Sequence, residues 1–373
     1  MQPATSASSF FDRQLCTRGA EVRLRRPIRS CFLLSALLVF PSLLAVSAAG
    51  QTTSPQLQVL LQKGHAALDA GDFPRAVATF EQARQFAPQN LEVEKNLILS
   101  YLEVGQISAA ITASRADVQR WPQDARIRHL LGLAYFKSGQ NAPAIEELQH
   151  AAKIDGRSFD IHFDLALALL NANQYAPAAD ELEKAIKLDT SNALAHLLLG
   201  RAYQNSNRTV QAVEQFRTAL RLNPNLPLGY YHLGYAYGSL GQNQEAIAEY
   251  QKEIARSPDN PEVLYQLGHC LVETGDWKNA AIHLRRATQL NPANGDSFYD
   301  LGKALLAQGD VQAAISPLRR AIELNPTDPS PHYQLARALQ KLGDASAAEE
   351  WRRFAELKKS QPQTGGMATG RVH

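Results

Sequence analysis

Apolar and small residues recur along this chain with a period of 34 residues. Three consecutive segments between residues 193 and 294 superimpose without a gap, and their eighth residues are Gly200, Gly234 and Gly268. A fixed short period of this kind is typical of a solenoid. Extending the frame in both directions defines nine segments, at residues 57–90, 91–124, 125–158, 159–192, 193–226, 227–260, 261–294, 295–328 and 329–360.

The apolar positions inside each segment follow the period of an α-helix. Position 7 is leucine in eight segments, and position 20 is alanine in all nine. Positions 7 and 11 lie one turn apart on a first helix, whereas positions 20, 24 and 27 form a stripe on a second helix. Small residues at positions 8, 20 and 27 allow two helix backbones to approach, and larger residues at 7, 11 and 24 fill the surrounding space. The pattern therefore predicts an antiparallel helix pair in every segment.

Residues at the segment ends predict where the helices begin and end. Position 15 is glycine or asparagine throughout, and these residues most readily take the left-handed conformation that closes a helix. The last residue of each segment can cap the following helix, except Leu226. Pro227, Pro261 and Pro329 come next, at the first helical position. Four aspartates after the position-15 turn are predicted to cap second helices: Asp72, Asp276, Asp310 and Asp344.

These segments resemble the tetratricopeptide repeat, whose period they share. The residues of the fifth segment that fall on the motif positions of that family are Gly200, Tyr203, Ala212, Phe216, Ala219 and Pro224. The resemblance covers residues 57–360 and implies an all-α fold, a right-handed α-solenoid of nine contiguous helix-turn-helix repeats. The second segment departs from the pattern, with Ile98 at position 8, Ser114 at position 24 and Asp117 at position 27.

The first fifty residues have a different composition. Four arginines precede an apolar run at residues 31–46, and Ser47, Ala48 and Ala49 follow it. This order predicts a secretory signal peptide of bacterial type over residues 1–50, cleaved after Ala48 or Ala49, with a true start near Val22. An uncleaved membrane anchor is the alternative. Either way, the repeats are expected in the periplasm or outside the cell. Residues 51–56 are predicted to be a linker, and residues 361–373 a disordered tail.

The charge of the chain changes once this leader is set aside. The formal net charge is +2, but residues 1–50 hold six arginines against two acidic residues. The remaining chain has 32 basic and 34 acidic residues, which gives a net charge of −2. Because no basic stripe remains, we do not expect nucleic acid as the partner.

No motif of enzyme chemistry is present in the sequence. It contains no glycine-rich phosphate loop, no His-Glu-x-x-His and no Gly-x-Ser-x-Gly. His162, His196 and His332 all occupy position 4, where we expect partly buried core residues rather than metal ligands. Cys270 is expected to be an inert buried thiol. We therefore predict no enzyme, no cofactor and no metal.

The resemblance also implies where a partner would bind. In this family, positions 2, 5, 9 and 12 of the first helices line the concave groove, and tyrosine recurs here at position 5 of four segments. Tyrosine is favoured in interfaces. The alternative is that these tyrosines reflect only the consensus of the family. The predicted groove residues are Phe163, Leu167, Leu197, Arg201, Tyr231, Tyr235, Glu262, Tyr265, His269, Asp296, Tyr299, Lys303, Tyr333 and Arg337.

Two groove chemistries known in the family do not match. The carboxylate clamp needs lysine at position 5 with asparagine at position 9, but Lys95 is followed by Leu99. The asparagine ladder needs asparagine repeatedly at position 6, and only Asn96 fits. The ligand therefore cannot be assigned by analogy.

The sequence leads to one main hypothesis and two alternatives. The main hypothesis is an exported, non-enzymatic scaffold that binds an extended peptide or a helix of another protein in the groove, with a monomer favoured. One alternative is a docking or regulatory subunit of a separately encoded envelope enzyme or assembly machine. The other is a structural spacer that acts by self-association.

Overall fold

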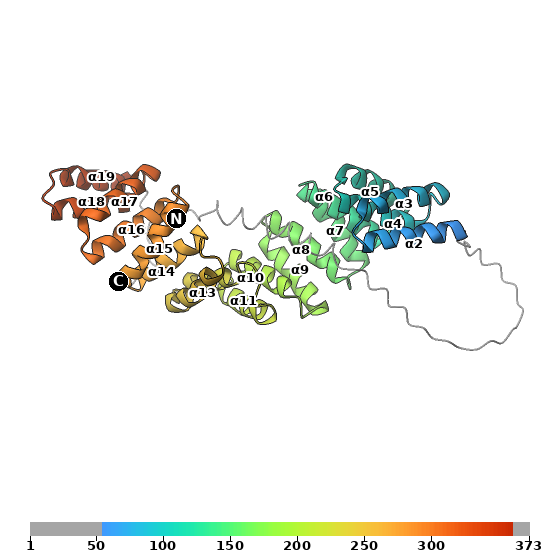
Figure 1. The fold of residues 1–373 in the computed structure, drawn as a ribbon, viewed down its shortest axis with the longest axis horizontal. Helices are drawn as coiled ribbons and strands as arrows, with labels where there is room; N and C mark the ends of the chain where they lie inside the picture. The colour runs from blue at the N-terminus through green and yellow to red at the C-terminus, as the bar shows by residue number, and fades with distance from the viewer. Residues whose placement is uncertain (1–53, 361–373) are drawn as a thin grey trace, which may run out of the picture. The chain divides into compact units, whose positions relative to one another are not determined.

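The computed structural model describes residues 54–360, and this part of the chain contains eighteen α-helices and no strand. The predicted signal peptide and C-terminal tail lie outside the described residues. None of the described helices is long and apolar enough to cross a membrane. In chain order the helices are α2 (Pro55–Asp69), α3 (Phe73–Phe86), α4 (Leu91–Val104), α5 (Ile107–Arg120), α6 (Ala125–Lys137), α7 (Asn141–Ile154), α8 (Phe159–Asn171), α9 (Tyr175–Leu188), α10 (Ala193–Asn205), α11 (Thr209–Leu222), α12 (Gly229–Ser239), α13 (Asn243–Arg256), α14 (Pro261–Glu273), α15 (Trp277–Leu290), α16 (Gly295–Gln308), α17 (Val311–Leu324), α18 (Pro329–Lys341) and α19 (Ala347–Ser360) (Figure 1).

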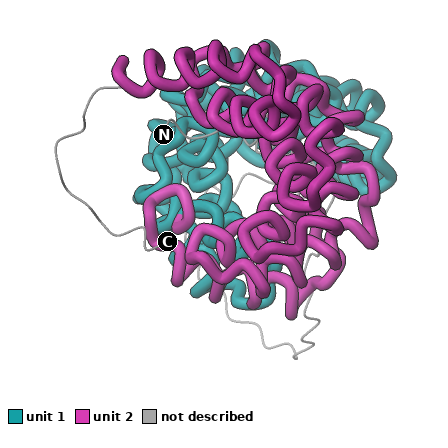
Figure 2. Tube along the Cα trace, turned by 90° about the vertical axis from the view of Figure 1, so that its left-hand side faces the viewer, with its two compact units in different colours: residues 1–202 teal, residues 203–373 magenta. Residues whose placement is uncertain are grey.

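The chain forms two compact units, residues 1–202 and residues 203–373, which Figure 2 colours separately. Inside each unit, a helix packs against the helix that follows it along the chain. The first helix of a repeat also packs against the first helix of the next repeat, as α4 does with α6 and α14 with α16. The predicted helix pairs are confirmed, and the fold is a helical solenoid of repeats.

Close approach of the two helices of a repeat depends on the small residue at position 8. A Cβ atom added to Gly268 would lie 2.5 Å from Cγ of Leu284, which occupies position 24 of the same repeat. An added Cβ at Gly302 would lie 2.6 Å from Cγ of Leu318. Both separations are far inside van der Waals contact, so the predicted pairing of a small position 8 with a large position 24 is confirmed.

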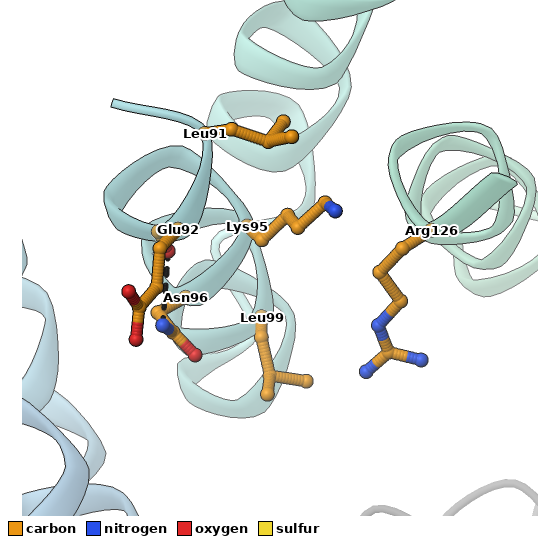
Figure 3. A pocket seen from close by; sticks show the side chains of 6 residues that line it. All are labelled: Leu91, Glu92, Lys95, Asn96, Leu99 and Arg126. Carbon is orange, nitrogen blue, oxygen red and sulfur yellow. Dashed lines mark hydrogen bonds between the residues drawn. The ribbon is translucent and has the colours of Figure 1, made fainter. Parts of the chain in front are cut away.

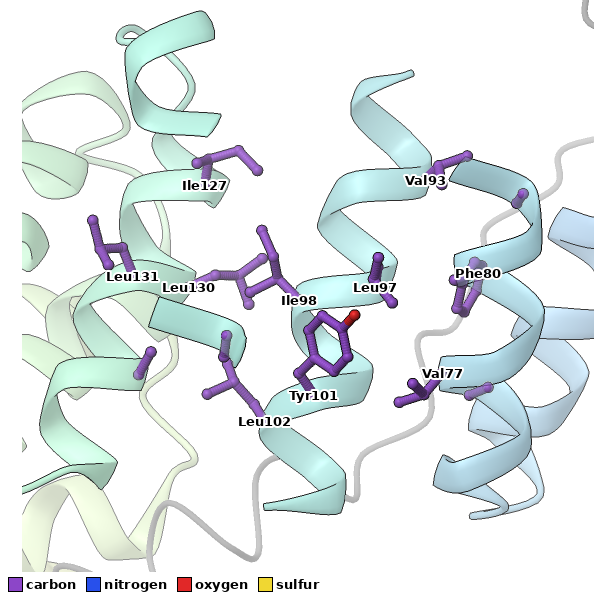
Figure 4. Close-up of a cluster of buried hydrophobic side chains, with 14 of the residues drawn as sticks. Val77, Phe80, Val93, Leu97, Ile98, Tyr101, Leu102, Ile127, Leu130 and Leu131 are labelled. Carbon is purple, nitrogen blue, oxygen red and sulfur yellow. The ribbon is translucent and has the colours of Figure 1, made fainter. Parts of the chain in front are cut away.

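The core of unit 1 runs continuously from one repeat into the next. Phe80 of α3, Leu97 and Ile98 of α4 and Leu130 of α6 are each 0 % exposed and form part of one cluster (Figure 4). Leu97 and Ile98 are neighbours in sequence but point to opposite sides of α4, one toward α3 and the other toward α6. Helix α4 therefore packs one side chain against the preceding repeat and another against the following repeat, so that one core extends through all three.

The second repeat reverses the usual sizes at this contact. Ile98 takes the position of the glycine, Ser114 takes the position of the large residue, and both are 0 % exposed. The Ser114 hydroxyl donates a hydrogen bond to the Ala110 carbonyl oxygen at 2.6 Å, which satisfies its polarity in the core. The larger side chain has moved from the second helix to the first.

Turns and caps follow the sequence pattern closely. All nine residues at position 15 have positive φ, from 58° at Asn173 to 89° at Gly309, as predicted. The predicted caps at segment ends also form: the Asp124 carboxylate, for example, accepts from the Ile127 N–H at 2.9 Å. Asp310 differs, because it precedes α17 without a side-chain capping bond.

Two helix starts differ from the prediction. Helix α2 begins at Pro55, so residues 55 and 56 belong to a helix and not to the predicted linker. Helix α12 begins at Gly229, two residues after Pro227, and the residue before it, Leu228, has a φ of 58°. The reason is that Leu226 is buried, at 7 % exposure, and contributes to the core where the other repeats have a polar cap.

The buried carboxylate of Glu253 takes over part of the capping of α12. Glu253 lies on α13 at position 27, is 3 % exposed, and accepts hydrogen bonds from the backbone at Tyr231, Tyr230 and Leu228. Burial raises the pKa of Glu253, whereas these bonds and Arg256 lower it. A carboxylate at a helix N-terminus also interacts favourably with the helix dipole.

The outer face of α19, the last described helix, is polar. Glu349, Arg352, Glu356 and Lys358 of α19 are all exposed. Arg352 lies 3.1 Å from Glu349, and Arg353 lies 3.3 Å from Glu356. This charged surface replaces the apolar residues that earlier second helices bury.

Candidate partner-binding surface

One row of aromatic residues crosses four consecutive first helices of unit 2. Tyr231, Tyr265, Tyr299 and Tyr333 occupy position 5 of α12, α14, α16 and α18, and each is partly exposed. These helices pack against one another in chain order. Equivalent positions on adjacent helices therefore form a continuous surface. We call it the tyrosine face, and its residues are Tyr231, Tyr235, Glu262, Tyr265, His269, Asp296, Tyr299, Lys303, Tyr333 and Arg337.

Aromatic side chains on this surface contact one another along each helix. The Tyr231 and Tyr235 rings are 6.2 Å apart, and Tyr235 is 41 % exposed. The Tyr265 ring lies 6.0 Å from the His269 ring. Position 9 is one turn beyond position 5, so each pair extends the aromatic surface along its helix.

The last repeat adds two aromatic residues that the sequence reasoning missed. The Tyr333 ring lies 5.4 Å from Trp351 and 5.3 Å from Phe354, both on the second helix α19. The Arg337 guanidinium lies over the Tyr333 ring at 5.6 Å. The prediction considered only first helices, and the aromatic residues of α19 were the signal that could have shown this contact.

Two ion pairs join α14 to α16 on this surface. His269 Nδ1 lies 2.8 Å from Asp300 Oδ2, and Lys303 Nζ lies 3.1 Å from Glu273 Oε1. The hydrogen bond with Asp300 raises the pKa of His269, although burial opposes it. These contacts fix the spacing between the two helices that carry Tyr265 and Tyr299.

Acidic groups gather at the N-terminal ends of the same two helices. Glu262 and Asp296 both occupy position 2, and burial is the main reason that the pKa of each is raised. The charge of Asp296 raises the pKa of Glu262 further, while a hydrogen bond from the Gln266 amide, at 3.0 Å, lowers it. Burial and the charges of Asp300, Asp296 and Glu262 raise the pKa of Tyr265. The carboxylates and this tyrosine therefore share one electrostatic environment.

Four predicted groove residues lie elsewhere and are buried. Phe163, Leu167 and Leu197 are at most 1 % exposed, and Arg201 is 5 % exposed. Their side chains present no surface to a partner in this structure, because the apolar positions of α8 and α10 contribute to the core. The accessible part of the predicted site is restricted to unit 2.

Unit 1 contains an open pocket between α4 and α6. Its volume is about 410 Å³, and its lining residues are Leu91, Glu92, Lys95, Asn96, Leu99 and Arg126. Lys95 and Arg126 extend toward the same opening from the two helices (Figure 3). Lys95 Nζ, however, lies 2.6 Å from Asp124 Oδ2, so an internal carboxylate already compensates its charge. Leu99 occupies the position where the carboxylate clamp would need asparagine.

The Arg126 side of this pocket is also rich in acidic groups. Arg126 Nη1 lies 3.2 Å from His129 Nδ1, and His129 Nε2 lies 2.7 Å from the buried Asp164. Burial lowers the pKa of Arg126, and the charges of Asp160, Asp164 and Asp124 raise it. This pocket therefore has no clear excess of positive charge for an anionic ligand.

The position-4 histidines take part in internal contacts. His162 and His332 are 4 % and 7 % exposed, and each lies 2.6 Å from a glutamate of the second helix of its repeat, Glu181 or Glu350. The prediction that these residues belong to the core is confirmed, and they are more fully buried than expected. Among residues 54–360, no group of three or more His, Cys, Asp or Glu side chains is arranged to hold a metal ion.

The stacked helix pairs and their exposed aromatic row define a helical-repeat scaffold. Tetratricopeptide repeat family models match residues 57–82, 95–158, 159–192, 206–241, 231–295, 265–329 and 318–350. The chain belongs to the tetratricopeptide repeat family. This family gives it a fold that is typically non-catalytic and the general function of a protein–protein interaction scaffold.

Several solved structures are similar to this chain. YrrB, described as a TPR protein with an unusual peptide-binding site, is 24 % identical over 51 % of this chain and 97 % of its own, with a TM-score of 0.46. The APC/C hetero-tetramer Cut9-Hcn1 is 19 % identical over 79 % of this chain and 57 % of its own, with a TM-score of 0.47. MamA from Desulfovibrio magneticus RS-1 is 23 % identical over 46 % and 97 %, with a TM-score of 0.43. No curated protein matches the chain.

Proposed function

We propose that this chain is an exported, non-enzymatic scaffold that holds an extended segment or a helix of another protein against the tyrosine face. The observation that carries the proposal is the row of four partly exposed tyrosines on adjacent helices of one unit. Tyrosine combines a large contact area with few rotatable bonds, so little entropy is lost when it binds. The ion pairs between α14 and α16 link the two helices that carry Tyr265 and Tyr299.

Replacing Tyr265 and Tyr299 with alanine tests this surface. The double variant is expected to bind partner segments at least about tenfold more weakly, because aromatic anchors dominate interface energetics. Binding can be measured by interferometry against peptides selected from a random dodecapeptide phage library with the wild-type chain. Far-UV circular dichroism should show nearly unchanged helicity and melting temperature.

A matched control is provided by two exposed apolar residues on second helices. Val210 of α11 and Ile282 of α15 are 62 % and 53 % exposed. The Val210→Ala/Ile282→Ala variant removes apolar surface away from the tyrosine face and should bind like the wild type. Equal binding by the tyrosine variant and the wild type would disprove the assignment of the surface.

Export is part of the same proposal. The support is the order of charged, apolar and small residues in the leader, which lies outside the described residues. N-terminal sequencing of the protein recovered from its own cells should give a chain that starts at Ala49 or Gly50. Recovery of an intact leader from the cytoplasmic fraction would contradict export.

A monomer is the state that the polar final face supports. The charged outer surface of α19 disfavours end-to-end stacking, because burying its carboxylates and guanidinium groups would cost desolvation energy. Light scattering at several concentrations should give a constant mass of one chain. A mass that rises with concentration would favour a spacer that self-associates.

A further inference from the structure

We propose that the partner segment carries a lysine or arginine, and that this side chain lies between Glu262 and Asp296 beside the Tyr265 ring. This inference rests on the proposed function, since it names the chemistry of the partner at the tyrosine face. It follows from the register of the helices, the local charges and the aromatic surface next to them.

The repeat register brings three groups together. Glu262 and Asp296 occupy the same position of consecutive repeats, on helices α14 and α16, which pack against each other. Tyr265 lies one helical turn from Glu262, and the charges of both carboxylates act on its hydroxyl. The two carboxylates and the ring therefore border one region of the surface.

The negative charge in this region is only partly compensated from within the chain, by the charge of His269, which lowers the pKa of Asp296. Within residues 54–360, no ion pair includes Glu262 or Asp296; the recorded hydrogen bond to the Glu262 carboxylate comes from the neutral Gln266 amide. The nearby cations already have partners, since Lys303 pairs with Glu273 and His269 with Asp300. A cation from outside the chain is the missing partner.

Burial and nearby negative charge keep both carboxylates in an unfavourable state when ionised. Burial is the main reason that the pKa of each is raised; the charge of Asp296 adds to the effect on Glu262, and the charges of Asp300 and Asp328 add to the effect on Asp296, whose pKa His269 lowers. A bound cation would reverse the repulsion and lower both pKa values, so binding would release protons. The affinity for a basic segment should therefore increase as the pH rises through the range where these groups ionise.

The aromatic surface selects the same kind of side chain independently. A guanidinium or ammonium group is attracted to the face of a tyrosine ring, and Arg337 over Tyr333 shows this contact inside the chain itself. An apolar side chain would bury the two carboxylates without a partner, and an acidic one would be repelled. Arginine fits best, because its planar group can stack on a ring while it bonds to a carboxylate.

The test uses the full chain and dodecapeptides selected from a random phage library. We expect the selected peptides to contain Arg or Lys, and replacement of that residue by glutamine should weaken binding to the wild-type chain by about tenfold. The Glu262→Gln/Asp296→Asn variant should bind the basic peptide and its glutamine analogue equally. The control variant Asp259→Asn/Glu323→Gln changes the net charge by the same amount at exposed sites and should keep the preference.

A second probe needs no selected peptide. N-acetyl-arginine methylamide and its neutral isostere N-acetyl-citrulline methylamide can be titrated into chain labelled with 3-fluorotyrosine, with the Tyr265 signal assigned from Tyr265→Phe. The arginine compound should shift the Tyr265 ¹⁹F signal at lower concentration than the citrulline compound, and Glu262→Gln/Asp296→Asn should remove this difference.

The outcomes separate this inference from the proposed function. Peptides that need Tyr265 and Tyr299 but show no preference for a basic residue would overturn the inference and leave the proposed function standing. A basic preference that persists in Glu262→Gln/Asp296→Asn would also overturn it. Failure to obtain any tyrosine-dependent peptide would disprove the proposed function, and equal ¹⁹F shifts with both probes would then disprove the inference as well.

Discussion

The second and sixth repeats both replace the usual alanine of position 27 with a buried carboxylate, and the two carboxylates have different neighbours. In the sixth repeat, Glu253 faces the N-terminus of α12 and accepts hydrogen bonds from its backbone, although its Oε2 atom has no partner in the described structure. In the second repeat, Asp117 is 2 % exposed and lies near another buried carboxylate, Glu94, which is 3 % exposed. The first carboxylate stabilises a helix start, while the second adds to a concentration of buried negative charge.

The difference shows that the groups around a buried carboxylate determine its effect on stability, even when two carboxylates occupy the same repeat position. Asp117 has one ion pair, with Arg120 at 3.4 Å, and its Oδ2 atom has no hydrogen-bond partner in the described structure. Burial raises the pKa of Asp117, and Arg120 and Arg84 lower it. Burial and the charge of Asp117 raise the pKa of Glu94 to about 7. The second repeat is therefore expected to respond to pH.

The largest loss of stability should come from changing Ile98, the large residue that replaces the usual glycine in the second repeat. Ile98→Ala is expected to lower the free energy of unfolding by about 2–5 kcal/mol, because it opens a cavity in a fully buried site. The double variant Ile98→Gly/Ser114→Leu restores the order of the other repeats and should recover much of this loss. Urea unfolding followed by circular dichroism measures both, with exposed Val210→Ala as the control. A double variant no more stable than Ile98→Ala would show that the two positions do not compensate.

Removing the carboxylate of the sixth repeat should have a somewhat smaller effect. Glu253→Ala leaves backbone N–H groups at the start of α12 without their acceptor and is expected to cost about 1–3 kcal/mol. Hydrogen exchange at Leu228, Tyr230 and Tyr231 should become faster. Glu245→Ala, an exposed change on the same helix, is the control. Unchanged exchange at these three amides would rule out the capping role of Glu253.

The second repeat should lose stability as the pH rises. The pKa of Glu94 is about 7 in the folded chain against a reference value of 4.5, so the folded state binds more protons between these values. This contribution is complete below the reference value and is lost as the pH rises through about 7, with a total of about 1–3 kcal/mol. The difference in urea midpoint between the wild type and Glu94→Gln should change with pH accordingly. A constant difference from about pH 5 to about pH 8 would contradict this expectation.

The smallest expected change in the free energy of unfolding is a gain in stability, whereas Glu253→Ala is expected to cause a loss. Asp117→Ala gives the second repeat the residue found at position 27 of seven other repeats and removes a buried carboxylate. It is expected to stabilise the chain by about 1 kcal/mol above neutral pH, where Glu94 is ionised. Urea unfolding at two pH values checks this, and a loss of stability at the higher pH would show that the Asp117–Arg120 pair outweighs the repulsion.

Local patterns in the sequence were sufficient for most of the fold. The left-handed residue at position 15, the caps and the Gly268–Leu284 contact are set by residues within one repeat, so the period alone predicts them. The late start of α12 was not predicted, because Pro227 indicated a helix start, although the missing cap at Leu226 was a local signal; the contact of Glu253 with this helix start comes from another helix. Such a contact depends on tertiary packing and leaves no local signal.

The site was predicted less completely than the fold. The tyrosine face could be predicted from the tyrosines at position 5 of four segments, because the repeat register places equivalent residues on adjacent helices. Phe163, Leu167 and Leu197 were assigned to the groove by the same register, although their apolar character also indicated burial. Trp351 and Phe354 were missed because the register of the first helices says nothing about side chains that reach Tyr333 from α19.

Cys270 gives the chain an internal reporter of local opening. It is the only cysteine in residues 54–360, it is 3 % exposed, and burial raises the pKa of its thiol to about 11. Because the thiolate is the reactive form, a thiol reagent at neutral pH modifies this residue mainly when α14 comes away from its neighbours. The same helix carries Glu262 and Tyr265, so the rate of modification measures how often that surface is disrupted, and a ligand held against it should slow the reaction.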